Sequence, residues 1–274
     1  MADYFGAHNL FLEPVIFGPQ KIESLISKLQ KNPKIIISVF GLAGVGKGTL
    51  SDLLAKNLLI PNLDTGKIWR AITYIYTTLS LEISPQNTDL VLSKLHIIAK
   101  SSQLEFHFED QKLLHTDLKN GLIDSKVSII AGDNYTHQQF FIRCLEVYQK
   151  IDTAFVRDGR GASPKDIRLA ETDGFRVIRI LLDCSDKVKW ERYYNNIFLN
   201  KRGNNLNLEN TQEFEIKLRK EFETNIIARN NRDILNQQEL GNGLITPQTG
   251  VIKSDNLGPE EVLQITLNFI DQEV

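Results

Sequence analysis

The feature that most constrains this chain is the stretch IIISVFGLAGVGKGTL, residues 35–50, where an apolar run meets a glycine-rich turn. The β-branched run at 35–40 is typical of a buried strand, and leucines then recur with helical period from Leu50 to Leu58. A strand, a glycine turn and a helix in this order predict the first unit of a parallel α/β sheet.

The turn itself, residues 41–49 and here called the glycine loop, departs by one position from the common phosphate-binding pattern. That pattern places Ser or Thr directly after Gly-Lys. Here Gly46 and Lys47 are followed by Gly48, and Thr49 stands one residue late. Such glycines let backbone N–H groups surround phosphate oxygens, and the next helix directs its positive end at the same anion. An ordinary glycine turn is the alternative, but the flanking strand and helix favour phosphate binding.

Three further apolar runs, at residues 154–160, 176–184 and 249–255, are separated by helix-like segments. Strands that alternate with helices predict a three-layer α/β fold around a parallel sheet. The stretch at 104–115 instead alternates apolar and polar residues around an acidic turn, which predicts a small hairpin. We place this hairpin in an insert at about 84–135 that covers the acceptor of the reaction discussed below.

Two segments fall outside this alternation. Residues 1–33 are predicted to form an N-terminal extension to a domain at 34–274, with a short amphipathic helix from Lys21 to Leu29. The Asn-rich segment 195–210 is predicted to interrupt two basic helical stretches, and we expect a mobile lid near 195–225.

Composition excludes several classes of protein. A net charge of −2 over 274 residues implies neither a nucleic-acid nor a membrane partner. Cys144 and Cys184 are far apart, and the five histidines never cluster at ligand spacing, so we expect no structural metal. Two cysteines so far apart suit a reducing compartment, and no apolar stretch reaches the roughly 18 residues of a membrane span. With no signal-like N-terminus, the expected location is cytoplasmic.

A second motif, LDTGKIWR at residues 63–70, places a turn directly before a helix that carries Arg70. The Thr65 hydroxyl and exposed N–H groups would lie beside a planar cation able to bind a phosphate in a bidentate manner. The alternative is a purely structural helix cap formed by the Asp-Thr-Gly turn.

A third motif, VRDGRG at residues 156–161, follows a predicted parallel strand. Ligand groups in open α/β sheets lie at the carboxyl ends of the strands, so Arg160 is a candidate to bind a second phosphate. A strand exit with a surface ion pair is the alternative interpretation.

In chain order, GLAGVGKGT, LDTGKIWRA, DGR, ILLDCSDKVKWER and VIKSDNLGPEEVLQ resemble the motifs of the cytidylate kinases. These P-loop enzymes transfer the γ-phosphoryl of ATP to CMP or dCMP. The resemblance covers about residues 35–274. Adenylate kinases share the G-K-G-T loop and the T-G-x-x-x-R turn, but they carry an aromatic residue and a proline before the arginine that follows D-G. The run Asp158-Gly159-Arg160 is therefore more similar to the cytidylate branch.

The resemblance implies ATP as phosphoryl donor, Mg²⁺, and a pyrimidine nucleoside monophosphate as acceptor. Residues that would bind ATP are Gly41, Leu42, Ala43, Gly44, Val45, Gly46, Lys47, Gly48 and Thr49. Thr49 would also reach the metal indirectly, through a phosphate or a bound water. Residues that would contact the acceptor are Thr65, Arg70, Arg143, Asp158, Arg160 and Arg229. Residues assigned to catalysis are Lys47, Arg160, Arg192 and Arg232.

Amphipathic helices carry surface arginines in any case, so an ordinary surface role stays open for Arg143, Arg192, Arg229 and Arg232. The chain also departs from the family pattern. Phe40 and Leu42 replace the usual Asp and Pro around the first loop glycine, and Gly161 replaces the Asp that helps to read the base. An Asp expected three residues before Arg232 is missing. The phosphate contacts survive and the base contacts are fewer, which predicts transfer with weakened cytidine selectivity. The alternative is a catalytically impaired nucleotide-binding protein that docks a protein partner through residues 1–33.

Overall fold

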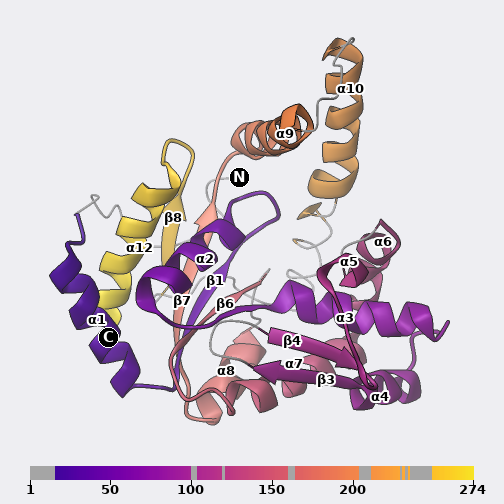
Figure 1. Ribbon diagram of the computed structural model, residues 1–274, viewed down its shortest axis with the longest axis horizontal. Helices are drawn as coiled ribbons and strands as arrows, with labels where there is room; N and C mark the ends of the chain where they lie inside the picture. The colour runs from indigo at the N-terminus through magenta and orange to yellow at the C-terminus, as the bar shows by residue number, and fades with distance from the viewer. Residues whose placement is uncertain are drawn as a thin grey trace.

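The computed structural model describes residues 16–99, 104–118, 121–159, 164–203, 211–228, 230–231, 234 and 249–274. Its centre is a sheet of five parallel strands in the order β2-β6-β1-β7-β8 (Figure 1). The strands are β1 (Ile35–Phe40), β2 (Asn62–Asp64), β6 (Phe155–Asp158), β7 (Arg176–Asp183) and β8 (Thr249–Lys253). The strands predicted within residues 35–40, 154–160, 176–184 and 249–255 are confirmed, and they pair in parallel as predicted.

Helices cover both faces of this sheet, because successive residues of each strand point to opposite sides. Ile35, Ile37 and Val39 of β1 pack with one helical layer, whereas Ile36 packs with the other. The first layer contains α1 (Pro19–Lys31), α2 (Lys47–Leu58) and α12 (Pro259–Glu273). The second contains α3 (Thr65–Thr78), α7 (Asn134–Tyr148) and α8 (Pro164–Thr172). The molecule is therefore the three-layer α/β fold that the sequence predicts.

Helix α1 belongs to the first layer and extends beyond the predicted Lys21–Leu29 at both ends. Leu25 and Leu29 have no exposed surface and pack with residues of α2 and α12. The described part of the predicted extension, from residue 16 onward, thus contributes to the core. The domain boundary between residues 33 and 34 stays a prediction, and residues 1–15 lie outside the described residues.

The predicted hairpin is confirmed and is part of a larger unit. Strands β3 (Leu95–Ala99), β4 (Leu104–Phe108) and β5 (Gln111–Lys112) form an antiparallel sheet. Helix α4 (Pro85–Lys94) precedes it in the chain, and α5 (His115–Leu118) and α6 (Gly121–Ile130) follow it. Phe106 of β4 and Ile130 of α6 share a buried cluster with residues of α3, so this unit is fixed against the second layer. Its boundaries as an insert at 84–135 stay a prediction.

Helices α9 (Asp186–Gly203) and α10 (Thr211–Phe222), here called the arm, stand out from the body of the molecule (Figure 1). The prediction that residues 195–210 interrupt the helix is wrong where the structure describes them, because α9 continues through residue 203. Asn lowers helix stability only by a fraction of a kcal/mol per residue, roughly 0.7 at most. The remaining residues, 204–210, lie outside the described part.

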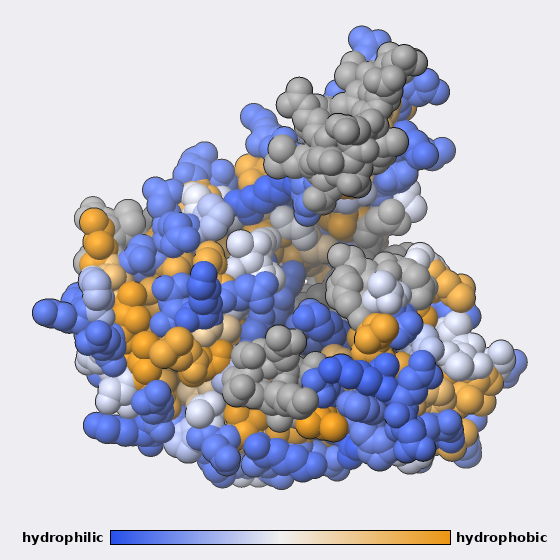
Figure 2. Space-filling view, in the orientation of Figure 1, coloured by the Kyte–Doolittle hydropathy of each residue, from blue (hydrophilic) through white to orange (hydrophobic). Residues whose placement is uncertain are grey.

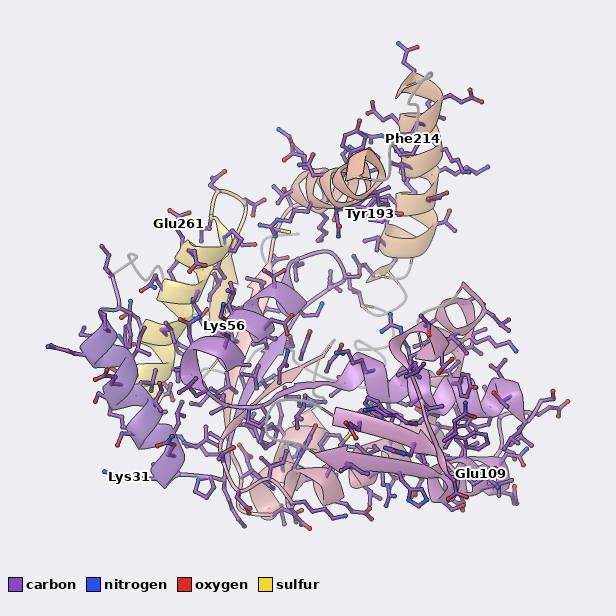
Figure 3. All side chains as sticks on the ribbon, in the orientation of Figure 1. Lys31, Lys56, Glu109, Tyr193, Phe214 and Glu261 are labelled. Carbon is purple, nitrogen blue, oxygen red and sulfur yellow. The ribbon has the colours of Figure 1, made fainter. Side chains whose placement is uncertain are left out.

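Aromatic packing joins the two helices of the arm. The ring of Phe222 lies 5.4 Å from that of Trp190 and 5.5 Å from that of Tyr193, measured between centroids. Figure 3 shows Tyr193 on the side of α9 that faces α10. The guanidinium of Arg219 lies 4.7 Å from the Trp190 ring centroid, which adds a cation–π contact. After α10 the chain forms a π-helix, η1 (Glu223–Ile227), before it returns to the body.

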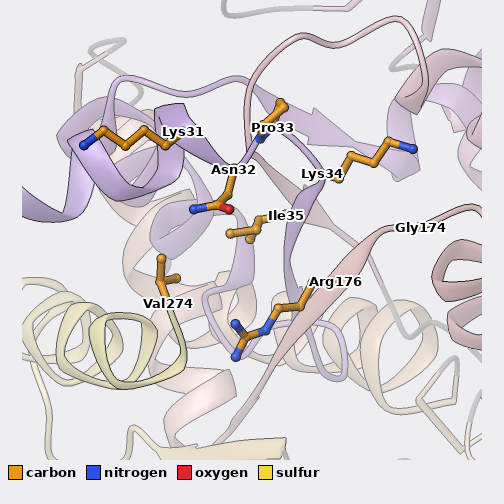
Figure 4. Close-up of a pocket in the computed structure, with 8 residues that line it drawn as sticks. All are labelled: Lys31, Asn32, Pro33, Lys34, Ile35, Gly174, Arg176 and Val274. Carbon is orange, nitrogen blue, oxygen red and sulfur yellow. The ribbon is translucent and has the colours of Figure 1, made fainter.

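A surface hollow of about 270 Å³ lies at the amino-terminal edge of the sheet (Figure 4). Two of its basic residues are already engaged with neighbouring groups. Lys34 Nζ donates to the carbonyl of Asp173 at 3.1 Å, and Arg176 pairs with Glu273 at 3.4 Å. The predicted functional motifs end at the opposite, carboxyl-terminal edge, so this hollow is separate from them.

Both cysteines are buried thiols, Cys144 in α7 and Cys184 at the end of β7. Among the described helices none combines the length and the apolar composition needed to cross a bilayer. Within the same residues, no three His, Cys, Asp or Glu side chains come together as metal ligands.

The contact between β8 and α12 gives a test of how the sheet edge is built. A Cβ on Gly250 would lie 2.8 Å from the ring of Phe269. We expect Gly250→Ala to cost about 1–3 kcal/mol of unfolding free energy through this overlap. In a Phe269→Leu background the cost of the same change should fall by at least half. Urea unfolding of the four proteins measures this, and an equal cost in both backgrounds would exclude the overlap as the cause.

Candidate functional site

All three predicted motifs meet at the carboxyl-terminal edge of the sheet, because its strands run parallel. The glycine loop leaves β1, the Asp-Thr-Gly turn joins β2 to α3, and Asp158 ends β6. Strand β6 lies between β1 and β2, so the third motif is next to both of the others. Ligand sites in open α/β sheets occur at this edge, beside the strands where the chain changes direction.

The glycine loop takes a backbone path that side chains resist. Gly41 has φ of +143°, and a Cβ at this position would overlap the carbonyl oxygen of Leu182 on β7. Gly46 has φ of +99° and is the N-cap residue of α2. Left-handed backbone of this kind costs glycine little. The loop therefore turns tightly around the start of α2, and the N–H groups of that first turn, which precede the helix's own ladder of bonds, give the site its positive character.

Lys47 is the first residue of α2 and its side chain folds back across the loop. Its Nζ donates to the carbonyl of Leu42 at 2.7 Å. Gly48 and Thr49 lie at the same end of the helix, and both are exposed. Asp158 approaches this end from β6, because its Oδ2 lies 3.6 Å from where a Cβ on Gly48 would be. A cation, a hydroxyl and a carboxylate are thus gathered around one open helix end.

The predicted acceptor residues of the second and third motifs also meet. Thr65 Oγ1 donates to the main-chain carbonyl of Asp158 at 2.7 Å. Asp64 caps α3 by accepting from the N–H of Lys67 at 3.2 Å. The guanidinium of Arg70 folds back over this first turn, with Nη1 3.4 Å from where a Cβ on Gly66 would be. The structure therefore brings Thr65, Arg70 and Asp158 into one group beside the glycine loop.

The Asp158 carboxyl has a pKa close to neutral pH. Burial is the main cause that raises the pKa of this carboxyl from 3.8 to about 6. The ammonium of Lys47 pulls the pKa down, while the nearby carboxylates of Asp64 and Asp52 push it up. A small change in the local charge, such as the arrival of phosphates or a divalent ion, will therefore change the protonation of Asp158.

Arg143 lies apart from this group. It belongs to α7, where Nη1 donates to Glu146 at 2.5 Å and Nη2 donates to the carbonyl of Leu95 at 3.2 Å. These bonds direct the guanidinium toward the start of β3. Its role near the base stays a prediction. Three other predicted residues, Arg160, Arg229 and Arg232, lie outside the described residues, as does Gly161.

Arg192 of α9 lies against the outer side of the glycine loop. Nη1 donates to the carbonyl of Val45 at 2.8 Å and to Ser254 Oγ at 3.2 Å. Nη2 donates to the carbonyl of Ser254 at 2.8 Å. In this arrangement Arg192 joins the loop to the end of β8. The role of Arg192 in closing over the phosphoryl group stays a prediction. The structure shows that Arg192 holds the glycine loop against Ser254.

Two residues near the loop were not predicted from the sequence. Lys189 is 4% exposed, and its Cβ and Cγ lie 3.4 Å from where a Cβ on Gly44 would be. Lys189 precedes Arg192 by three residues, so helical spacing alone indicates a shared face of α9. Asn230 bonds to Ala43 across 187 residues of chain, and no local pattern reveals such a contact.

A parallel five-stranded sheet with a glycine loop after its central strand defines the P-loop kinase class of α/β proteins. The cytidylate kinase family model matches residues 37–272, and the chain belongs to this family. A similar protein is the cytidylate kinase of Clostridioides difficile (strain 630), 30% identical over 132 residues, 46% of this chain and 56% of that protein.

Two further relatives are also cytidylate kinases. That of Alkaliphilus oremlandii is 31% identical over 99 residues, which cover 35% of this chain and 43% of that protein. That of Lysinibacillus sphaericus is 27% identical over 195 residues, 70% of this chain and 80% of that protein. The chain spans about half the length of the first two relatives, 56% and 43%.

The raised pKa of Asp158 predicts a pH-dependent cost of folding. The folded state holds this proton up to about pH 6 whereas the unfolded chain loses it near 3.8, so the group's stabilising contribution is lost as pH rises through 6. We expect Asp158→Asn to raise the free energy of unfolding by up to about 3 kcal/mol at about pH 8. At about pH 4 the gain should vanish. Denaturant unfolding of both proteins at both pH values measures the gain in free energy of unfolding. An equal gain at both pH values would contradict the raised pKa of Asp158.

Proposed function

We propose that the chain is a nucleoside monophosphate kinase that transfers the γ-phosphoryl of ATP to CMP or dCMP, giving ADP and CDP or dCDP. The observation that carries the proposal is the meeting, at one sheet edge, of two groups of residues suited to bind phosphate. The glycine loop with Lys47 is one, and the turn with Thr65 and Arg70 is the other. A donor and an acceptor phosphate held side by side are what phosphoryl transfer requires.

The donor would bind at the glycine loop. The N–H groups at the start of α2 and the turn at Gly46 suit a chain of phosphate oxygens. The Lys47 ammonium is within reach of the same space, because it already bonds across the loop to Leu42. When phosphates arrive, their oxygens replace that carbonyl as the better acceptors.

The residues near the loop also suit Mg²⁺, which prefers oxygen donors and retains several waters. The exposed Thr49 hydroxyl and the Asp158 carboxylate are oxygen donors at the open end of α2. They would hold the ion mainly through its waters and the donor's phosphates. When bound, Mg²⁺ neutralises charge on the phosphates. A divalent ion close to Asp158 would also favour its ionised form.

The acceptor needs no general base, because the attacking group is already a phosphate oxyanion. The protein's task is to align the two phosphates and to neutralise their mutual repulsion. We assign Arg70 and Arg160 to the acceptor phosphate and Thr65 to the turn that receives it. Arg229 and Arg143 stay predicted acceptor contacts, the second near the base, and Arg232 stays assigned to catalysis.

We assign to the arm the role of a cover for this edge. Figure 2 shows the surface hollowed below the arm, between it and the part of the body that carries α6. Closure of such a cover excludes water, which would otherwise accept the phosphoryl group in place of the nucleotide. The proposal of a lid near 195–225 therefore extends to α9 and α10 as its helical parts.

The choice of CMP or dCMP rests on the family and on the names of the relatives, and the chain departs from the family pattern at the base. Phe40, at the family's usual Asp position before the first loop glycine, is buried and packs with Leu181 and Val251. Gly161 has no side chain with which to read a base. The proposed phosphate-binding residues are thus better supported than the proposed preference for cytosine.

The kinase mechanism predicts a large loss on removal of the loop cation. Lys47→Met should lower the transfer rate by several orders of magnitude, because the ammonium stabilises the migrating phosphoryl more than the bound donor. A coupled assay of ADP release, with CMP, dCMP, UMP, AMP and GMP offered in turn, measures it. Lys56→Met is the matched control, since Lys56 is exposed on the same helix (Figure 3).

Turnover of the Lys47→Met protein at the parent rate would overturn the mechanism. If the parent protein binds ATP but turns over none of the five monophosphates, the alternative of an impaired nucleotide-binding protein gains support. In that case a partner that docks through residues 1–33 would be the next function to test.

Base selectivity gives a second test of the proposal. A polar group buried to pair with one base rejects another by as much as about 10⁴-fold, because the wrong base leaves it unpaired. Gly161 cannot do this, so we expect CMP to be the best acceptor with UMP within roughly 100-fold, a gap of about 2.7 kcal/mol. Gly161→Asp should widen the gap in favour of CMP. Ratios of kcat/KM for the two acceptors decide it, and an unchanged ratio would mean that another residue reads the base.

A further inference from the structure

Asn230, located shortly after η1, pairs with the main chain of the glycine loop in both directions. Its Oδ1 accepts from the N–H of Ala43 at 2.9 Å, and its Nδ2 donates to the carbonyl of Ala43 at 3.3 Å. Only 3% of Asn230 is exposed, so water competes little for either bond. A buried planar amide that matches one residue's donor and acceptor is a specific contact.

These two bonds fix two successive peptide planes of the loop. The Ala43 N–H belongs to the peptide between Leu42 and Ala43, and the Ala43 carbonyl belongs to the peptide between Ala43 and Gly44. In a trans peptide the C=O and N–H groups point in opposite directions. The carbonyl held by Asn230 therefore turns the N–H of Gly44 away from Asn230.

The second of these peptides needs such a constraint. Gly44 has φ of +87° and no side chain, so its backbone has more accessible conformations than that of any other residue type. A flip of the Ala43–Gly44 peptide would exchange an N–H donor for a carbonyl oxygen on the inner side of the loop. An anion-binding loop depends on N–H groups directed to one side, and a carbonyl there would repel phosphate.

The π-helix η1 is an independent sign that the position of Asn230 matters. Its N–H to C=O bonds span five residues rather than four, and such turns are rare and found frequently at functional sites. The wider turn shifts the register of the next residues by about one position, or roughly 100° of rotation on a helix. Residue 230, three residues after the end of η1, is helical, and its side chain contacts the loop in that register.

The arm and the segment after it contact the loop at successive residues. Asn230 bonds to Ala43, the aliphatic part of Lys189 lies over Gly44, and Arg192 bonds to the carbonyl of Val45. Thus the outer side of the loop is contacted by α9 and by the chain that returns from α10. These three contacts connect the loop to α9 and to the chain that follows η1.

We propose that Asn230 is a positioning residue that holds the Ala43–Gly44 peptide in its anion-binding orientation, and so couples the seating of the arm to donor affinity. The inference rests on the proposed function, because it takes the loop to hold the donor's phosphates. It adds a residue and a mechanism to that site, and Asn230 itself does not contact the reacting atoms.

The test compares Asn230→Ala with Asn231→Ala in the full chain. Asn231 is the exposed neighbour, so its removal is a matched control. Titration calorimetry measures the Kd of ATP, of inorganic tripolyphosphate and of CMP for each protein. We expect Asn230→Ala to weaken ATP and tripolyphosphate by the same factor, about tenfold, with CMP unchanged. Asn231→Ala should bind all three as the parent does.

The outcomes separate this inference from the proposed function. If the parent binds neither ATP nor tripolyphosphate, the proposed function fails and the inference falls with it. If the parent binds both and Asn230→Ala binds them equally well, only the inference is overturned. A loss that is equal for CMP and for the donor, with a lower Tm, would show a merely structural role and would also overturn it.

A second variant tests the shift in register. Deletion of Thr224, an exposed residue inside η1, removes the extra residue and should rotate residue 230 away from the loop. Where the deletion protein shows the parent's circular dichroism, we expect the same loss of donor affinity as Asn230→Ala, and no further loss when the two changes are combined. Additive losses would contradict the coupling. The point variants decide the proposal even if the deletion protein fails to fold.

Discussion

The close approach of Gly41 to the carbonyl of Leu182 is the constraint on which the rest of the site depends. Any Cβ at residue 41 would overlap that oxygen, and φ there is +143°. The glycine lets the chain leave β1 beside β7 and turn at once into α2. The open first turn of α2 then lies at the sheet edge, next to Asp158 at the end of β6. An ordinary residue at position 41 would move the loop away from β7 and separate these groups.

Charge in this region is balanced by opposing groups held close together. Lys47 is folded onto the loop, and Asp158 is buried enough that its pKa rises to about 6. Such an arrangement costs free energy in the resting protein, because the carboxylate is desolvated. It is suited to a site where phosphates and a divalent ion come and go. Perturbed groups of this kind cluster at functional sites, and here the perturbation has a stated cause.

Local sequence patterns were sufficient to predict much of this fold and part of the candidate site. The glycine loop, the Asp-Thr-Gly turn and the parallel strands were predictable because each depends on residues close together in the chain. The meeting of Thr65 with Asp158 followed from the shared sheet edge. The bond between Asn230 and Ala43 joins residues 187 apart and was not predictable from a pattern. The continuation of α9 through residue 203 was not predicted, because Asn-rich sequence is typical of loops although each Asn costs a helix little.

The central claim is that the loop and the neighbouring turn hold two phosphates for direct transfer between them. The most direct measurement is ³¹P NMR of the protein mixed with MgATP and CMP, which follows both nucleotides and free phosphate at once. Direct transfer predicts that CDP and ADP appear in equal amounts and that inorganic phosphate does not accumulate. Formation of ADP and inorganic phosphate without CDP, or of neither product, would contradict it.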